Sequence, residues 1–326
     1  MPYYRIRDRR QGLSDGNVRL RHEVVLQTRF ASMLRRPRWR TLVRSVVWAL
    51  HLPEPVRQRL PVDGTFIFKL LDRRFVYHSD LHDGVGRALF WAAAEEYEAE
   101  TLSVLLHLLQ EAPANPTIFD VGANTGFYTL AVLAATPDAE VHAFEPVQHI
   151  ARALSENVSA NGFSRQVHIR ACAVTEQSGH AALHIPDQTW GNATLSVDGF
   201  RGLEGHLEQV AAVALDDYAS DRGLDHLDLL KIDVEGHEDA VLTGARRLMT
   251  EHRPAVLCEC LPELNAAAFN DLIVGLGYEA YHLRASGPVH VPQVAADPTG
   301  RFKNFLLLPR ERPRGDWLGT RHGTTP

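Results

Sequence analysis

The stretch TIFDVGANTGFYTLAVLAA, residues 117–135, constrains the fold more than any other part of the chain. Two glycines and an asparagine separate an apolar run that ends near Val121 from a second one that begins near Thr125. A strand, a tight turn and a helix explain this order, because glycine permits a sharp turn and small residues let backbone N–H groups approach a ligand. The stretch therefore predicts an α/β unit whose turn faces a bound molecule.

Apolar runs and helical periods alternate from residue 115 onward, a pattern typical of a parallel sheet covered by helices. Antiparallel strands between residues 180 and 215 interrupt this alternation. We therefore expect an α/β fold with helices on both faces of the sheet. The expected elements are strands at 117–122, 139–145 and 166–174, helices at 125–135, 147–161 and 264–275, and strands in LLKID, PAVLCECL, YEAYHLR and NFLLLP.

The N-terminal part of the chain differs from the rest in charge. Residues 1–60 hold 14 arginines and four acidic residues, a net charge of about +10. Nucleic acid is not expected as a partner, because the arginines in RTLVRSVVWALHL alternate with apolar residues as on an amphipathic helix with a solvated face. The segment PVDGTFIFKLLDRRFVYHSD predicts a β-hairpin. We divide the chain into an extension (1–94, helical segment and hairpin), a main domain (95–310) and a C-terminal tail (311–326).

Composition restricts the environment of the protein. No stretch reaches the roughly 20 apolar residues needed to cross a bilayer, and the first residues lack the apolar segment of a secretory signal. We expect a cytoplasmic protein without a transmembrane segment. A homodimer is compatible with the sequence, which does not determine the oligomeric state. Cys258 and Cys260 are one residue apart, a spacing unlike a zinc site, and are expected in a strand.

The glycine turn and an acid on the next strand predict an adenosyl ligand. Glu145 ends the strand in HAFEP, where a carboxylate can accept hydrogen bonds from both ribose hydroxyls. A nicotinamide dinucleotide would suit the same acid, but the turn lacks the G-x-G-x-x-G spacing that brings backbone against a pyrophosphate. S-adenosylmethionine needs one close backbone approach and the ribose clamp. Ala173 and Val174 end the following strand, where adenine would lie.

Ionisable residues follow another buried strand, in LLKIDVEGHEDAV. Asp233 and His237 gather where a parallel sheet opens its ligand crevice, and Glu259 ends the next strand in CECLPE. A hydroxyl acceptor must lose a proton, and a histidine suits that role without a shifted pKa. We therefore predict His237 as general base, Asp233 as its orienting group, and Glu259 as the alternative base. Glu238 is expected to begin a helix as a favourable first-turn acid.

These residues resemble the FkbM family of S-adenosylmethionine-dependent methyltransferases through FDVGANTGFYTL, AFEP, LLKIDVEGHE, ECLPE and NFLLLP. The resemblance covers roughly residues 95–309. It implies a class I methyltransferase (Rossmann-like) fold with seven strands, the last antiparallel, and O-methylation of natural products, sugars or glycolipids. By this resemblance Glu98 matches a position where the family often has glutamate. The implied cofactor-binding residues are Asp120, Gly122, Ala123, Asn124, Thr125, Gly126, Glu145, Pro146, Ala173, Val174 and Asp233.

Other interpretations stay open at this point. Trp190, Asn192 and Thr194 in the antiparallel segment offer a flat apolar face with hydrogen-bonding groups for a small-molecule acceptor. No metal is expected, although the carboxylates near Asp233 could hold magnesium in a metal-assisted O-methyltransferase. An NAD(P)-dependent oxidoreductase or epimerase and a noncatalytic adenosyl-binding module are the remaining alternatives, the first disfavoured by the glycine spacing and the second by the ionisable cluster.

Overall fold

The computed structural model describes residues 5–6, 16–17, 21–23, 63–80, 82–92, 97–186, 195, 205–261, 265–297, 302–313 and 317–318. The amphipathic segment RTLVRSVVWALHL and the residues Trp190, Asn192 and Thr194 lie outside the described residues.

The centre of the molecule is an eight-stranded sheet with the order β15-β14-β16-β13-β12-β6-β7-β8. Strands β13, β12, β6, β7 and β8 are mutually parallel, and β16 is antiparallel to both of its neighbours. The seven predicted strands with the last one antiparallel are confirmed, and β15 adds an eighth at the edge. The strands are β6 (Thr117–Val121), β7 (Glu140–Phe144), β8 (Val167–Arg170), β12 (Leu229–Ile232), β13 (Ala255–Glu259), β14 (Tyr278–Arg284), β15 (Gly287–Val291) and β16 (Asn304–Pro309).

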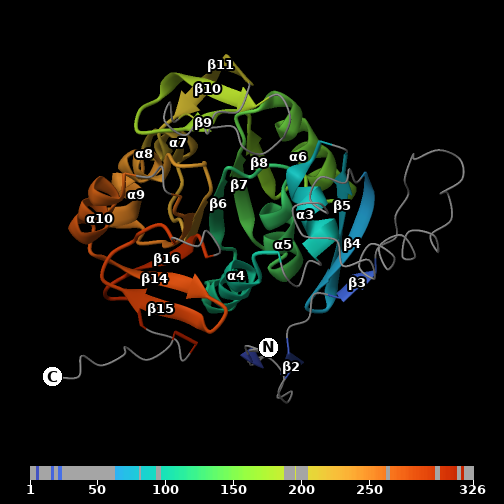
Figure 1. The fold of residues 1–326 in the computed structure, drawn as a ribbon, viewed down its shortest axis with the longest axis horizontal. Helices are drawn as coiled ribbons and strands as arrows, with labels where there is room; N and C mark the ends of the chain where they lie inside the picture. Colours follow the sequence, from blue (N-terminus) through green and yellow to red (C-terminus); the bar gives the residue numbers. More distant parts are fainter. Residues whose placement is uncertain are drawn as a thin grey trace, which may run out of the picture.

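Helices cover both faces of this sheet because successive strand residues point to opposite sides. In β6, Ile118 packs in one hydrophobic cluster while Phe119 and Val121 pack in another. The first cluster includes residues of α4, α5 and α6, and the second includes residues of α7 to α10. These helices are α3 (Gly84–Ala92), α4 (Ala99–Glu111), α5 (Phe127–Ala135), α6 (Gln148–Ala160), α7 (Leu215–Arg222), α8 (Glu238–Thr243), α9 (Arg246–Glu251) and α10 (Ala266–Gly275) (Figure 1).

A small sheet extends from the main one and changes one predicted strand. The single strand expected at 166–174 is wrong, because β8 ends at Arg170 and β9 (Ala173–Val174) pairs with β11 instead of β7. The antiparallel segment expected between residues 180 and 215 is confirmed as β10 (Gly179–Pro186) and β11 (Gly205–Val213). Figure 1 shows this small sheet, in green and yellow, at one end of the molecule.

The predicted hairpin is formed by β4 (Gly64–Leu70) and β5 (Arg73–Ser79). Its aromatic residues Phe66, Phe68 and Phe75 belong to the same hydrophobic cluster as α4 and α5, and Phe68 meets Phe127 edge-on with ring centroids 5.8 Å apart. The hairpin thus shares the core of the main sheet. The remaining described strands of the extension are β1 (Arg5–Ile6), β2 (Gly16–Asn17) and β3 (Arg21–Glu23), and β3 pairs with β4.

Two asparagines attach the hairpin to the domain: Asn157 on α6, and Asn161, which caps the C-terminal end of that helix. Asn157 accepts from the His78 amide at 2.7 Å and donates to its carbonyl, and Asn161 forms the same pair of bonds with Val76 at 2.6 Å each. The backbone N–H and C=O groups of Val76 and His78, on the edge of β5 away from β4, thereby form hydrogen bonds with the two asparagine side chains. Within the described part of the chain, no helix combines the length and the apolar character that a bilayer-spanning segment requires.

Candidate functional site

A cavity of about 550 Å³ opens at the carboxyl ends of the parallel strands. It lies between the sheet, the start of α3, the residues before α4, and the small sheet. Nine residues that the sequence predicted for the site line this cavity together. They are Gly122, Ala123, Asn124, Glu145, Pro146, Ala173, Val174, Asp233 and Glu259.

The turn after β6 needs glycine at residue 122. Gly122 has φ +76°, and a Cβ there would lie 1.8 Å from the Asp233 carbonyl oxygen. The backbones that follow β6 and β12 therefore approach closer than any side chain allows. The Gly122 and Ala123 amides both donate to the Phe144 carbonyl, at 3.0 and 2.9 Å. Strand ends β6, β7 and β12 are thus joined at the floor of the cavity.

Glu145 is held at the carboxyl end of β7, as predicted. Its side chain is 5% exposed, and its two oxygens accept hydrogen bonds from the Asn124 amide at 3.1 Å and the Val147 amide at 2.9 Å. Burial raises the pKa of Glu145 to about 7, although these two bonds favour the carboxylate. The acid therefore sits beside the glycine turn, in the position expected for a ribose clamp.

Three residues predicted to contact the cofactor are not among the described residues that line the cavity: Asp120, Thr125 and Gly126. Asp120 lies below the turn and accepts a 2.6 Å hydrogen bond from the Thr129 hydroxyl. The Thr125 hydroxyl is bonded to that of Tyr77 in the hairpin. A Cβ on Gly126 would lie 2.5 Å from a methyl group of Leu154, so this glycine lets α5 approach α6. Each of the three residues therefore stabilises the turn through contacts with other parts of the protein.

Carboxylates also gather along the cavity lining, beginning at Asp233 beside the Gly122 turn. Asp233, Glu235 and Glu259 each offer an oxygen within 4.8 Å of the others. Burial, together with the charges of Asp233 and Glu235, raises the pKa of Glu259 to about 9, opposed by Lys303 at 3.4 Å. Such a cluster either retains a shared proton or binds a cation.

The sequence reasoning missed Lys231, which lies beneath this cluster. Its ammonium is 3.3 Å from Asp233 and 4.0 Å from Asp120, and 4.6 Å from the centroid of the Tyr128 ring. These carboxylates and Glu98 raise the pKa of Lys231 despite its burial, so the side chain stays charged. The signal was present, because Lys231 interrupts the apolar run LLKI and lysine occurs in this chain only at 69, 231 and 303.

Glu98 also lines the cavity, and its role was open from the sequence. It precedes α4 in a left-handed backbone conformation and accepts a hydrogen bond from the Tyr128 hydroxyl. Burial raises the pKa of Glu98, and the nearby Asp233 adds to this effect. Glu98 therefore joins Asp233, Glu235 and Glu259 among the acidic residues that line the cavity, which we call the acidic wall.

His237 is not among the described residues that line the cavity. It stands directly before α8 and its carbonyl accepts from the Val241 amide at 3.3 Å. Glu238 begins α8 as predicted, but it is fully buried and accepts from the Val234 and Gly236 amides. Burial raises the pKa of Glu238 to about 7. Glu238 thus fixes the loop that carries Asp233 and Glu235, whereas His237 lies outside the wall.

Leu183 of the small sheet and Leu195, in the segment between β10 and β11, supply part of the remaining wall. Leu195 directly follows the predicted acceptor-binding residues Trp190, Asn192 and Thr194, which lie outside the described residues. Gly84, Val85 and Ala88 of α3 close the side nearest the hairpin. The cavity lining therefore combines apolar groups with the carboxylates, and Arg87 of α3 adds a basic side chain.

The family model described as "Methyltransferase FkbM domain" matches residues 120–280. The chain is 30% identical over 158 residues to "Methyltransferase sdnD" of Sordaria araneosa, covering 40% of this chain and 61% of that protein. It is 29% identical over 176 residues to "2-O-methyltransferase NoeI" of Sinorhizobium fredii (49% and 71%). It is 30% identical over 166 residues to "31-O-demethyl-FK506 methyltransferase FkbM" of Streptomyces tacrolimicus (43% and 63%). The match thus spans less than two thirds of the first and third of these relatives.

Among solved structures, the chain is similar to a methyltransferase FkbM from Methylobacillus flagellatus, with 15% identity, a TM-score of 0.40, and 70% of this chain and 66% of that one covered. It is also similar to an S-adenosylmethionine-dependent methyltransferase from Agrobacterium tumefaciens, with 11% identity, a TM-score of 0.43, and 77% and 72% coverage.

Proposed function

We propose that the chain is an S-adenosylmethionine-dependent methyltransferase acting on a hydroxyl oxygen of a small-molecule acceptor, a proposal supported by the match of residues 120–280 to the FkbM methyltransferase family model. The observation that carries the proposal is the juxtaposition of the Gly122 turn and Glu145 at the floor of one cavity. Oxygen is favoured as the accepting atom because two of the relatives are named for O-methylation.

The residues present fit the cofactor. A side chain at residue 122 would fill the close approach between the ends of β6 and β12, and glycine leaves it open. Glu145 faces the same space as a hydrogen-bond acceptor for ribose hydroxyls. Gly122, Ala123 and Asn124 would hold the amino-acid end, and Ala173 with Val174 would flank adenine. S-adenosylmethionine supplies, when bound, an electrophilic methyl group on a positively charged sulfonium.

The acidic wall supports a role in proton removal. An acceptor hydroxyl loses its proton as its oxygen is methylated, and a positioned carboxylate can take that proton. Asp233 and Glu259 both line the cavity, whereas His237 does not. We therefore favour Glu259, the alternative base of the sequence analysis, with Asp233 as its neighbour. Only the ionised form of Glu259 can accept the proton, and its pKa is raised to about 9, so turnover should increase as the pH rises toward that value. Lys231 keeps Asp233 in place at 3.3 Å.

Glu259→Gln and His237→Ala are expected to separate the two candidate bases. Removal of a general base lowers turnover by about 10²–10⁴-fold. We expect this loss in Glu259→Gln, measured as kcat with a labelled methyl donor and a methylated product, while binding of S-adenosylhomocysteine is retained. His237→Ala is the matched control and should stay within a few-fold of the unchanged protein. A larger loss in His237→Ala than in Glu259→Gln would return the role to the histidine.

A metal-assisted reaction is the second candidate, supported by the proximity of Asp233, Glu235 and Glu259 within 4.8 Å. Oxygen ligands of this kind suit Mg²⁺, which would acidify two adjacent hydroxyls of an acceptor. Dialysis against chelator should then abolish turnover, and Mg²⁺ should restore it. Full activity in excess chelator would leave only the metal-free mechanism.

Cofactor binding tests the whole proposal before any acceptor is known. Calorimetry with the purified chain should show binding of S-adenosylmethionine and S-adenosylhomocysteine but not of NAD⁺ or NADP⁺. Mass spectrometry of a metabolite pool, incubated with the chain and isotopically labelled S-adenosylmethionine, would then identify the acceptor. Binding of a dinucleotide with no heat from the adenosyl compounds would overturn the proposal in favour of an oxidoreductase or epimerase.

A further inference from the structure

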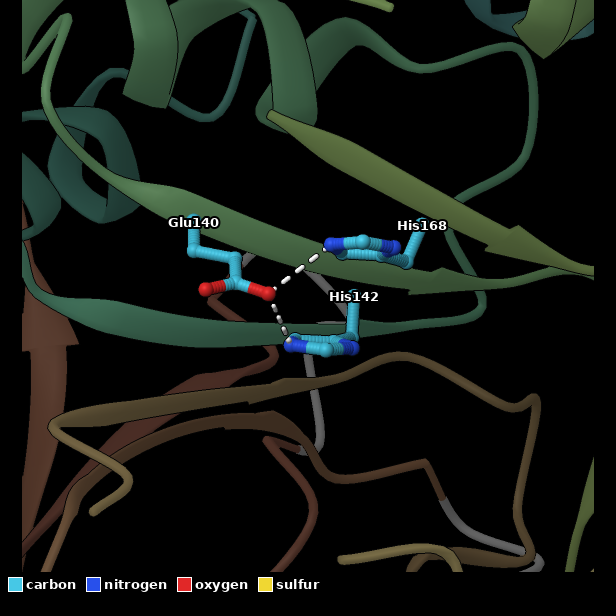
Figure 2. Close-up of side chains that lie close together, drawn as sticks. All are labelled: Glu140, His142 and His168. Carbon is cyan, nitrogen blue, oxygen red and sulfur yellow. Dashed lines mark ion pairs between the residues drawn. The ribbon is translucent and has the colours of Figure 1, made fainter. Parts of the chain in front are cut away.

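Glu140, His142 and His168 meet at the amino end of β7, at the other end of the strand from Glu145 (Figure 2). Residues 140 and 142 point to the same face of the sheet because strand residues alternate. His168 lies directly beside His142, since β7 and β8 are parallel with these residues in register. Strand geometry places this cluster roughly 13 Å along β7 from the cavity, so it is separate from the site described above.

The two imidazole rings are stacked, with centroids 4.8 Å apart, and both direct Nε2 toward Glu140. One Glu140 carboxylate oxygen lies 3.4 Å from His142 Nε2 and 2.8 Å from His168 Nε2. Two ligands bound to zinc at about 2.0–2.1 Å in tetrahedral geometry lie about 3.3 Å apart. The first separation already has this value, and the second requires a movement of about half an ångström. Two imidazoles and one carboxylate form a common set of zinc ligands.

A buried ring nitrogen of His142 is a second, independent observation that indicates a ligand between these three side chains. The His142 side chain is 1% exposed, and within the described structure its Nε2 is buried without a hydrogen-bond partner. The opposite ring nitrogen, Nδ1, lies 2.8 Å from the Tyr218 hydroxyl, which fixes the ring orientation. An oriented imidazole whose buried inner nitrogen has no hydrogen-bond partner can give that nitrogen to a metal once its proton moves to Nδ1.

The site is also reachable from solvent. The Glu140 side chain is 48% exposed and that of His168 is 34% exposed. A cation can therefore enter from the edge of the sheet, where β8 is the last strand. Water would supply the fourth ligand, because three protein atoms converge there.

Arg222 determines which protons occupy the histidines when no metal is bound. Its guanidinium lies 3.1 Å from His168 Nδ1 and 3.4 Å from the Tyr218 hydroxyl. Arginine only donates, so His168 Nδ1 accepts and its proton lies on Nε2, directed at Glu140. Tyr218, accepting from Arg222, directs its own proton to His142 Nδ1. Both inner nitrogens then carry protons, and a metal competes with this arrangement until Arg222 moves away.

We propose that Glu140, His142 and His168 form a binding site for a divalent transition-metal cation, Zn²⁺ in particular, which competes with Arg222. When zinc binds, each imidazole moves its proton from Nε2 to Nδ1 and donates its Nε2 lone pair. Arg222 turns to solvent, and Tyr218 then accepts from His142 Nδ1. The metal joins the edge strand β8 to β7 and, through Tyr218, to α7. This inference does not depend on the proposed methyltransferase activity.

The test is metal titration of the tag-free full chain after chelation, in excess Mg²⁺ so that the carboxylates of the cavity do not take up zinc. We expect one Zn²⁺ per chain by calorimetry, and Co²⁺ should give the visible absorption of a tetrahedral site. Glu140→Gln and His168→Ala should lose both signals. His180→Ala, which changes an exposed histidine on β10, is the matched control and should keep them.

Two further variants separate a metal site from a purely hydrogen-bonded cluster. Arg222→Ala removes the competitor and should bind Zn²⁺ several-fold more tightly than the unchanged chain. Tyr218→Phe removes the group that orients His142 and should weaken binding by about 10–100-fold. The proposal is overturned if Glu140→Gln and His168→Ala bind Zn²⁺ as the unchanged chain does, or if no variant, Arg222→Ala included, binds it. Equal affinity in Arg222→Ala and the unchanged chain would overturn the role of Arg222.

Discussion

Gly122 and Glu145 illustrate how single residues determine this site. Gly122 combines a positive φ with a backbone contact that excludes any Cβ, and Glu145 is a buried acid bonded to the same turn. The two residues act on a ligand in different ways, because the glycine creates space and the acid supplies hydrogen-bond acceptors. Each can therefore be tested by a substitution that changes only one of these properties.

Gly122→Ala is expected to abolish binding of S-adenosylhomocysteine. The added methyl group would lie 1.8 Å from the Asp233 carbonyl oxygen, so the end of β12 must move. The matched control is Gly162→Ala, because Gly162 has nearly the same φ, +74°, with nothing within 4 Å of its added Cβ. Both variants should lose about 1 kcal/mol of unfolding free energy to backbone strain. Calorimetry that finds equal ligand affinity in the two variants would contradict the steric role of Gly122.

Binding of an adenosyl ligand should weaken as the pH falls below about 7. Burial raises the pKa of Glu145 to about 7, and its carboxylate is the form that accepts from ribose hydroxyls. Protons then compete with the ligand, by up to about tenfold in affinity per pH unit. In the free protein the same raised pKa means that ionisation opposes folding, so this residue's contribution to stability is lost as the pH rises from 4.5 toward 7.

Glu145→Gln should bind more weakly and show no pH dependence of this origin, because glutamine does not titrate. Calorimetric titrations of S-adenosylhomocysteine between pH 5.5 and about 8.5 would compare the two proteins. A persistent pH dependence in Glu145→Gln would assign the titration to another group, such as the acidic wall around Glu259.

The hairpin strand β5 is joined to α6 by two side chains, which form the hydrogen bonds that a neighbouring strand would otherwise form. Asn157 on α6 and Asn161 at its C-cap, four residues later, pair with the backbone of β5. Asn157 also donates to the Thr125 carbonyl at 2.9 Å, so it links the hairpin to the glycine turn. The extension and the main domain are therefore connected through one helix face.

Asn157→Ala and Asn161→Ala should differ in their effect on the ligand site. Each leaves backbone groups of β5 without a partner, at a cost of about 1–3 kcal/mol. Hydrogen exchange should accelerate at the His78 amide in the first variant and at the Val76 amide in the second. Only Asn157→Ala should also weaken binding of S-adenosylhomocysteine, because Asn161 does not contact the turn. Equal binding in both variants would show that the hairpin and the turn are independent.

At the scale of the whole molecule, the cavity lies between parts that are distant in the sequence. Its lining includes Val85 of α3, Glu98 before α4, Glu145 at the end of β7, Leu183 of the small sheet and Glu259 of β13. A ligand that fills this cavity contacts all of them at once. Binding should therefore stabilise the molecule as a unit.

S-adenosylhomocysteine at 100 times its dissociation constant should raise the unfolding free energy by about 2.7 kcal/mol. Hydrogen exchange should slow together in α3, the start of α4 and the small sheet. NAD⁺ at the same concentration is the control and should change neither quantity. Protection restricted to residues 122–126 would indicate that the ligand contacts the turn alone.

The sequence by itself determined the elements that depend on local periodicity. The strand, turn and helix of residues 117–135, the hairpin and the antiparallel segment all follow from apolar spacing and turn residues. The antiparallel direction of the final strand was expected only from the family resemblance. Gly122 and Glu145 were found because their roles follow from their place at the end of a strand. The break between β8 and β9 was missed, because a continuous apolar run does not reveal that its last residues pair with a different strand.

Only the tertiary structure decided which side chains meet. Lys231 lies beside Asp120 because β12 pairs with β6 in a particular register, and His168 lies beside His142 because β8 pairs with β7. His237 is four residues from Asp233 but outside the cavity wall, because a loop with Glu235 and Gly236 at positive φ separates them. Distance along the chain fixes local conformation, whereas contacts between strands and helices depend on register and packing across the whole sheet.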